Sequence, residues 1–101
     1  MIKARVVARI VFRNLITEKE IGYGIFSRSI ALKKGVEPGS EISLPVGNQK
    51  TRNIFGKGPH KCTFKVKEII DSNGETTVVL AKTFFPASSV AEFEASWSRF
   101  V

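Results

Sequence analysis

The chain has 101 residues, with 16 Lys and Arg against 9 Asp and Glu, so its formal net charge is +7. Apolar residues make up 43% and charged residues 25%, which is the balance of a globular domain and excludes collagen-like and low-complexity proteins. A chain of this length is expected to form a single domain over residues 1–101.

A single cysteine, Cys62, cannot form an internal disulfide, which is typical of a reducing compartment and predicts a cytoplasmic location. No apolar run approaches the roughly 18 residues of a membrane span, so no membrane partner is expected. Lys3 and Arg5 interrupt the apolar region that a signal peptide needs. A mitochondrial presequence is the rival interpretation, because the first acid is Glu18, but the density of β-branched residues argues against it.

The first predicted strand covers residues 2–13. Even positions are apolar, and four of the six odd positions are cationic, which is the period-two alternation of a strand with one face in the core. Arg5, Arg9 and Arg13 also fall at the spacing of a helix, but five β-branched residues favour a strand.

Two further strands are predicted at about 21–32 and 41–46. In the first of these, Gly22 and Gly24 flank Tyr23, which indicates a bulge, a bend or a close backbone approach. In the second, Pro45 indicates an edge position. The following segment, 47–59, is a long irregular loop of a kind that is often functional.

The last two strands are predicted at about 60–70 and 76–85. Asn73-Gly74 lies between them and accepts positive φ, which predicts a tight hairpin. A helix is then expected over about 89–100. Ser89 followed by Glu92 matches a capping box, and Phe93 and Trp97 recur at helical spacing as core anchors.

About five strands with frequent turns and one terminal helix predict a mainly β fold. We expect a small antiparallel barrel or rolled sheet, OB-like or SH3-like, with a C-terminal α-helix.

Enzymatic and metal sites are not expected. The chain has one His, His60, and one Cys, Cys62, which is too few for structural zinc, and the two would lie side by side on one strand without a third orienting group. Asp71 lies in the predicted hairpin turn, where a structural role is usual. We therefore expect neither catalytic residues nor a cofactor.

The positive charge is concentrated in two segments. Residues 50–67 contain six Lys and Arg and no acid, and the first strand adds four more cations without an acid. A localised excess of this kind is typical of a surface that binds a polyanion.

The sequence thus predicts a nucleic-acid-binding domain with a preference for single strands and little sequence discrimination. Cations would neutralise phosphates, and Tyr23 and Phe55 would stack on unpaired bases. The alternative is a protein-interaction or regulatory module that binds an acidic partner, for example through an edge strand. The predicted nucleic-acid-binding residues are Lys3, Arg5, Arg9, Arg13, Tyr23, Lys50, Arg52, Phe55, Lys57, Lys61, Lys65 and Lys67.

Overall fold

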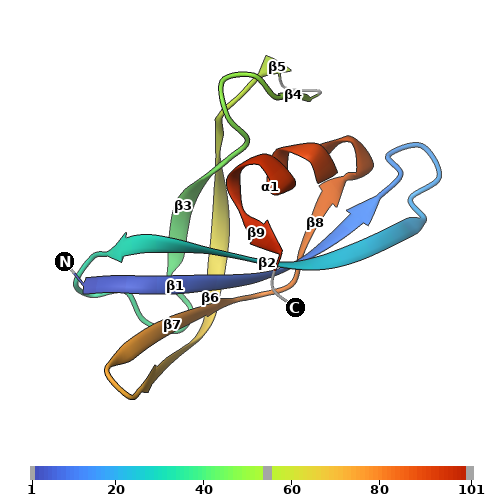
Figure 1. Cartoon of the computed structure of the whole chain (residues 1–101). Helices are drawn as coiled ribbons and strands as arrows, with labels where there is room; N and C mark the ends of the chain where they lie inside the picture. The colour runs from blue at the N-terminus through green and yellow to red at the C-terminus, as the bar shows by residue number, and fades with distance from the viewer. Residues whose placement is uncertain (1, 54–55, 100–101) are drawn as a thin grey trace.

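The computed structural model describes residues 2–53 and 56–99, which form a strongly curled sheet with a short helix in its concave face (Figure 1). The elements in chain order are β1 (Ile2–Arg13), β2 (Glu20–Leu32), β3 (Glu41–Val46), β4 (Arg52–Asn53), β5 (Gly56–Lys57), β6 (His60–Ser72), β7 (Glu75–Leu80), β8 (Thr83–Pro86), the 3-10 helix η1 (Ala87–Ser89), α1 (Val90–Ser96) and β9 (Ser98–Arg99). The predicted fold class, a rolled mainly β sheet with a C-terminal helix, is confirmed.

Within the described residues, seven strands form the main sheet in the order β3-β6-β7-β1-β2-β9, with β8 also paired to β1. The remaining strands, β4 and β5, form a separate small hairpin. The sheet was expected to be antiparallel, but β1 runs parallel to both β7 and β8. Alternation within a strand determines which face is buried but not which neighbour it pairs with, so the sequence pattern did not predict this arrangement.

The strand predicted at 76–85 is divided into β7 and β8. Val7 of β1 pairs with Val79, but Ile10 pairs with Thr83, so the register against β1 advances by one residue between the two strands. At the break, the Ala81 N–H donates to the Lys65 carbonyl oxygen at 2.8 Å, which ties this connection to β6. Because of this break, residues 76–86 can stay beside β1 as the sheet curls.

The hairpin between β6 and β7 turns where the sequence predicted. Asn73 and Gly74 have φ of 53° and 77°, and Ser72 pairs with Glu75 around them. Asp71 accepts a hydrogen bond at 2.6 Å from the Thr76 hydroxyl, which gives it the structural role expected at a turn.

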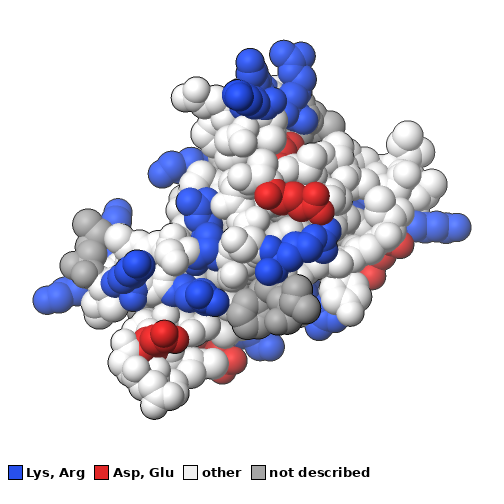
Figure 2. Space-filling model, viewed as in Figure 1, with Lys and Arg blue, Asp and Glu red and all other residues white. Residues whose placement is uncertain are grey.

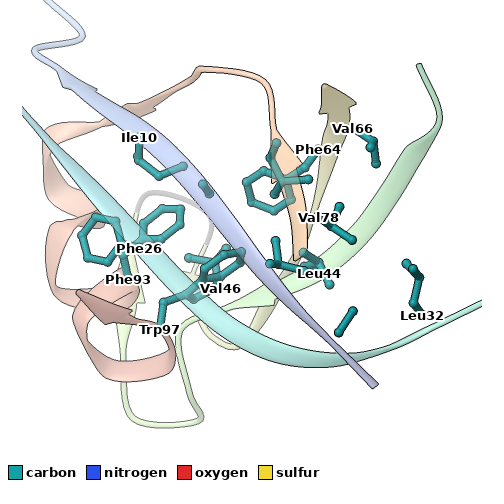
Figure 3. Packing of buried hydrophobic residues seen from close by; sticks show 14 of the residues in the cluster. Ile10, Phe26, Leu32, Leu44, Val46, Phe64, Val66, Val78, Phe93 and Trp97 are labelled. Carbon is teal, nitrogen blue, oxygen red and sulfur yellow. The ribbon is translucent and has the colours of Figure 1, made fainter. Parts of the chain in front are cut away.

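Aromatic side chains from the sheet and α1 fill the concave face (Figure 3). Phe93 is fully buried, and its ring centroid lies 5.9 Å from that of Phe12, 5.3 Å from Phe26 and 4.8 Å from Phe85. Trp97 is also buried, at 5.8 Å from Phe93. The predicted role of Phe93 and Trp97 as core anchors is therefore confirmed.

The helix is shorter than predicted, because α1 ends at Ser96 instead of continuing toward residue 100. Trp97 already has extended backbone angles, and the next residues pair as β9 with Phe26 and Ser27 of β2. Pairing with an open strand edge satisfies the backbone groups that further helical turns would have satisfied.

The predicted capping box is also absent. Ser89 makes no side-chain capping hydrogen bond and is buried, and Glu92 is buried beside Gly47. The short 3-10 turn before α1 supplies the entry to the helix instead: the Val90 N–H donates to the Ala87 carbonyl oxygen.

Candidate nucleic-acid interface

Alternation along β1 places its cationic side chains on the outer surface of the curled sheet, which we call the convex face. The cations are Lys3, Arg5 and Arg9, which are exposed, and Arg13, which is half-buried. Val6, Ala8 and Ile10 point the other way and are fully buried in the core. The sequence prediction for the orientation of β1 is therefore confirmed.

Two exposed rings lie on either side of β1 on the convex face. Val11 of β1 pairs with Tyr23 of β2 on one side and with Phe84 of β8 on the other, so the three side chains share one face across three strands. Tyr23 is 63% exposed and Phe84 is 45% exposed, whereas Val11 between them is only 3% exposed. We call these three residues the aromatic platform.

Cations lie against both rings of the platform. The guanidinium carbon of Arg9 is 5.0 Å from the Tyr23 ring centroid, and that of Arg13 is 4.1 Å from the Phe84 centroid. The Lys82 ammonium is 5.4 Å from the Phe84 centroid. Exposed cation–π contacts are worth about 0.5–1 kcal/mol, whereas stacking of a base on an aromatic side chain is worth about 1–3 kcal/mol. At Tyr23, where one exposed guanidinium lies against the ring, a stacked base would therefore outweigh the contact that it displaces.

The cations of β6 continue the positive charge away from the platform. Lys61, Lys65 and Lys67 are exposed, and the Lys65 backbone bonds to Ala81, the residue before Lys82. Lys61 and Lys65 are four residues apart on a strand, which corresponds to about 13 Å. Positive side chains therefore follow β6 from the β4–β5 hairpin to the neighbourhood of the platform.

Acidic side chains border this path at three places. Glu20 is the strand partner of Arg13, Glu41 is the partner of Lys65, and Glu68 follows Lys67. None of them forms an ion pair with a cation of β1 or β6 among the residues that the structure describes. These cations thus keep their capacity to bind phosphates.

The loop cations form a separate group. Lys50 precedes the β4–β5 hairpin, in which Arg52 pairs with Lys57, and this hairpin projects past α1, away from β1 (Figure 1). Figure 2 shows Lys and Arg side chains gathered over it. The predicted cations do not form one compact patch: the loop group and the β1 group are connected only along β6. Phe55, predicted to stack on a base, lies outside the described residues.

Hydrogen bonds from the Asn48 side chain and within the backbone hold the start of the loop. The Asn48 side-chain oxygen accepts from the backbone N–H groups of Lys50 and Thr51 at 2.8 and 3.1 Å. The Gly58 N–H donates to the Thr51 carbonyl at 2.7 Å. The loop cations are therefore carried on a structured turn.

His60 and Cys62 lie near the start of β6. A ring nitrogen of His60 lies 3.0 Å from the Gly56 carbonyl oxygen. Cys62 is half-buried against the core, where burial, and secondarily the charge of Glu92, raise the pKa of its thiol. In the described part of the chain, no three His, Cys, Asp or Glu residues cluster as metal ligands would, and no helix there is long and apolar enough to span a membrane.

Two residues of this surface, Phe84 and Lys82, were absent from the predicted site. Successive strand residues point to opposite faces, so one ring of the adjacent Phe84 and Phe85 is expected to be exposed, but the sequence does not indicate which one. The structure places Phe85 against Phe64 in the core, at a centroid distance of 5.9 Å, and leaves Phe84 outside. The position of Lys82 depends on the break between β7 and β8, which no local sequence pattern indicates.

Comparison with known proteins identifies no family for the chain. No family model matches the chain, and searches of curated proteins and of solved structures give no significant match.

Proposed function

We propose that this chain binds single-stranded nucleic acid on its convex face, with little preference for sequence. The observation that carries the proposal is the aromatic platform, in which Tyr23 and Phe84 are exposed on either side of Val11 with Arg9 and Arg13 against their rings. Exposed rings next to cations are the combination that single-strand binders use.

Each part of the surface would have its own task. Two successive unpaired bases would stack on Tyr23 and Phe84, and the displaced guanidinium groups would contact the phosphates of the same nucleotides. The floor of the platform is the apolar side chain of Val11, which offers no hydrogen bond to a base edge. Little sequence discrimination is therefore expected, since every base has a π face.

The strand would leave the platform along β6. Lys65 and Lys61 are spaced to meet phosphates of the nucleotides that follow, and Lys57 on the hairpin extends the path. In this arrangement the loop cations lengthen the site and do not build the platform.

We further propose a cytoplasmic location. The half-buried thiol of Cys62, with its raised pKa, is consistent with a cysteine that stays reduced.

Salt dependence of affinity tests the proposal. Fluorescence anisotropy with fluorescein-labelled dT10 should give an affinity that falls roughly 100-fold between 50 and 200 mM salt, if about five phosphates are neutralised. Absence of binding to both dT10 and rU10 at 50 mM salt would reject the proposed function.

Charge reversal shows whether the nucleic acid follows the cations of β6 or is attracted by the net charge of the protein alone. Lys61→Glu should weaken binding of dT10 and dA10 to a similar extent and make the salt slope shallower, because Lys61 contacts a phosphate and not a base. The matched control is Lys34→Glu, in the exposed turn between β2 and β3. If the two variants lose the same amount of affinity, net charge alone attracts the nucleic acid.

A further inference from the structure

The curled sheet does not close, and its open seam lies between β2 and β3. β9 covers β2 only at Phe26 and Ser27, and in the described part of the chain no strand pairs with residues 28–32 on the side away from β1. The outer edge of β3 is likewise without a strand partner among these residues. Two strand edges therefore face each other across the seam.

Backbone polar groups of β3 point into the seam. The Pro45 carbonyl oxygen accepts hydrogen bonds from Arg28 Nη1 and Trp97 Nε1, each at 3.0 Å, and both donors lie on the seam side. Because alternate residues of a strand present their backbone groups to the same edge, the N–H and C=O groups of Ser43 and Glu41 also face the seam. Proline is tolerated at residue 45 because its missing N–H would point into this gap.

The seam is too wide for β2 and β3 to pair directly. Paired strands lie about 4.8 Å apart and bond backbone to backbone, whereas here the whole side chain of Arg28 spans the gap. Beyond this bridge, the seam opens into a groove of about 400 Å³, within the range of roughly 300–1,000 Å³ that ligand sites occupy. Its apolar lining comes from both strands and the turn between them, and consists of Ile30, Leu32, Val36, Ile42 and Leu44.

The rim of the groove is mainly positive. Lys33 and Lys61 line it with one acid, Glu41, and Lys3 lies just outside it on β1, opposite Ala31. Figure 2 shows Lys and Arg side chains over the end of the molecule where β1 begins and β2 ends. A ligand with negative charge on its outward side would complement this rim.

We propose that this groove binds an extended, acidic peptide segment of a partner protein, which enters as an added β-strand between β2 and β3. The free strand edges supply main-chain hydrogen bonds, the apolar lining receives alternate side chains, and the rim lysines face the acidic side chains between them. The groove suits nucleic acid less well than a peptide: its rim lysines can meet phosphates, but its lining contains no aromatic ring on which a base could stack. A second copy of this chain would bring a net charge of +7 to a positive rim.

A designed peptide tests the proposal directly. The probe is a fluorescein-labelled peptide of seven residues that alternates valine and aspartate, and the control peptide alternates valine and lysine. The acidic peptide should bind saturably below about 1 mM, and the lysine peptide should not. In NMR spectra of the backbone amides, the chemical-shift changes caused by the acidic peptide should lie at residues 28–32 and 41–45.

Two protein variants identify the groove as the site. Ser43→Pro removes the N–H that a docking strand needs without removing a β3–β6 hydrogen bond, and should weaken binding about fivefold to tenfold, whereas Ser43→Ala should bind like the parent chain. Lys33→Glu removes rim charge at an exposed turn, and should weaken peptide binding while leaving dT10 binding unchanged.

Four results would overturn the proposal. The first three are no binding of the acidic peptide up to about 1 mM, equal affinity for the parent chain and for both Ser43→Pro and Lys33→Glu, and peptide-induced shifts confined to the convex face. Concentration-dependent dimerisation of the chain alone with shifts at residues 28–32 and 41–45 would also contradict it, since a second copy would then occupy the groove.

Discussion

Truncation of the two platform rings tests whether bases stack on the convex face. In Tyr23→Ala and Phe84→Ala, one stacking surface is removed while the neighbouring cations remain. The strands that carry them are held by pairing to β1, and both side chains are substantially exposed, at 63% and 45%. Neither substitution removes a fully buried side chain, so the fold should persist.

The expected magnitude follows from two opposing interactions. Stacking of one base contributes about 1–3 kcal/mol, from which the cation–π attraction that the base displaces, about 0.5–1 kcal/mol, is subtracted. Tyr23→Ala should therefore weaken binding by about 0.5–2 kcal/mol, or about 2- to 30-fold in Kd. The loss in Phe84→Ala should be smaller, because both Arg13 and Lys82 lie against that ring in the free protein. The cost in stability for Phe84→Ala should be about 1 kcal/mol, since the ring is only about half-buried.

Anisotropy titration of labelled dT10 at 50 mM salt is the assay, and urea unfolding verifies that each variant is folded. Tyr23→Phe keeps the ring and should bind nearly as tightly as the parent chain. Leu15→Ala, which removes a side chain that is 58% exposed in the β1–β2 connection, is the matched apolar control. Parent-like affinity in both alanine variants would refute stacking on the platform.

Three further predictions concern the fold that supports the site. Phe93→Ala should destabilise the protein by about 3–5 kcal/mol in urea unfolding, because the ring is fully buried among other aromatic side chains; a cost below about 1 kcal/mol would contradict the packing described. Gly47→Ala should lower the free energy of unfolding by about 1–3 kcal/mol, since Gly47 has a φ of +90° and a Cβ would lie 2.5 Å from the Thr51 hydroxyl oxygen. An unchanged urea midpoint would refute this strain. The pKa of Cys62 is raised above its ordinary value of 9.0 by burial and by Glu92, so the contribution of the protonated thiol is complete below the unfolded pKa and is lost as pH rises through the folded pKa. Stability should therefore fall more steeply at alkaline pH in the parent chain than in Cys62→Ala, and parallel profiles would contradict the raised pKa.

Local patterns in the sequence predicted the parts of the fold that depend on neighbouring residues. Alternation in residues 2–13 predicted a strand that matches β1, and Asn73-Gly74 predicted the turn between β6 and β7. The edge position of Pro45 was also correct, because a missing N–H is tolerated only where no strand pairs. In each case the signal lies within a few residues of its consequence.

Long-range pairing decided what the sequence did not predict. The parallel pairing of β1 with β8 brings Phe84 beside Val11, although the two residues lie far apart in the sequence. The end of α1 is set by the open edge of β2, where Arg99 pairs with Phe26. Tyr23 was included in the predicted site because glycines flank it in the sequence. Phe84, the second ring of the platform, could not be included, because its position depends on which strand lies next to β1.

A map of backbone amide shifts in the isotope-labelled chain, recorded as unlabelled dT10 is added at 50 mM salt, shows directly which surface the nucleic acid contacts. Binding on the convex face should give the largest changes at residues 9–13, Tyr23 and residues 82–84, with smaller changes along residues 61–65. Changes confined to the concave-face residues or to the β2–β3 seam, or no changes at saturating dT10, would contradict nucleic-acid binding on the convex face.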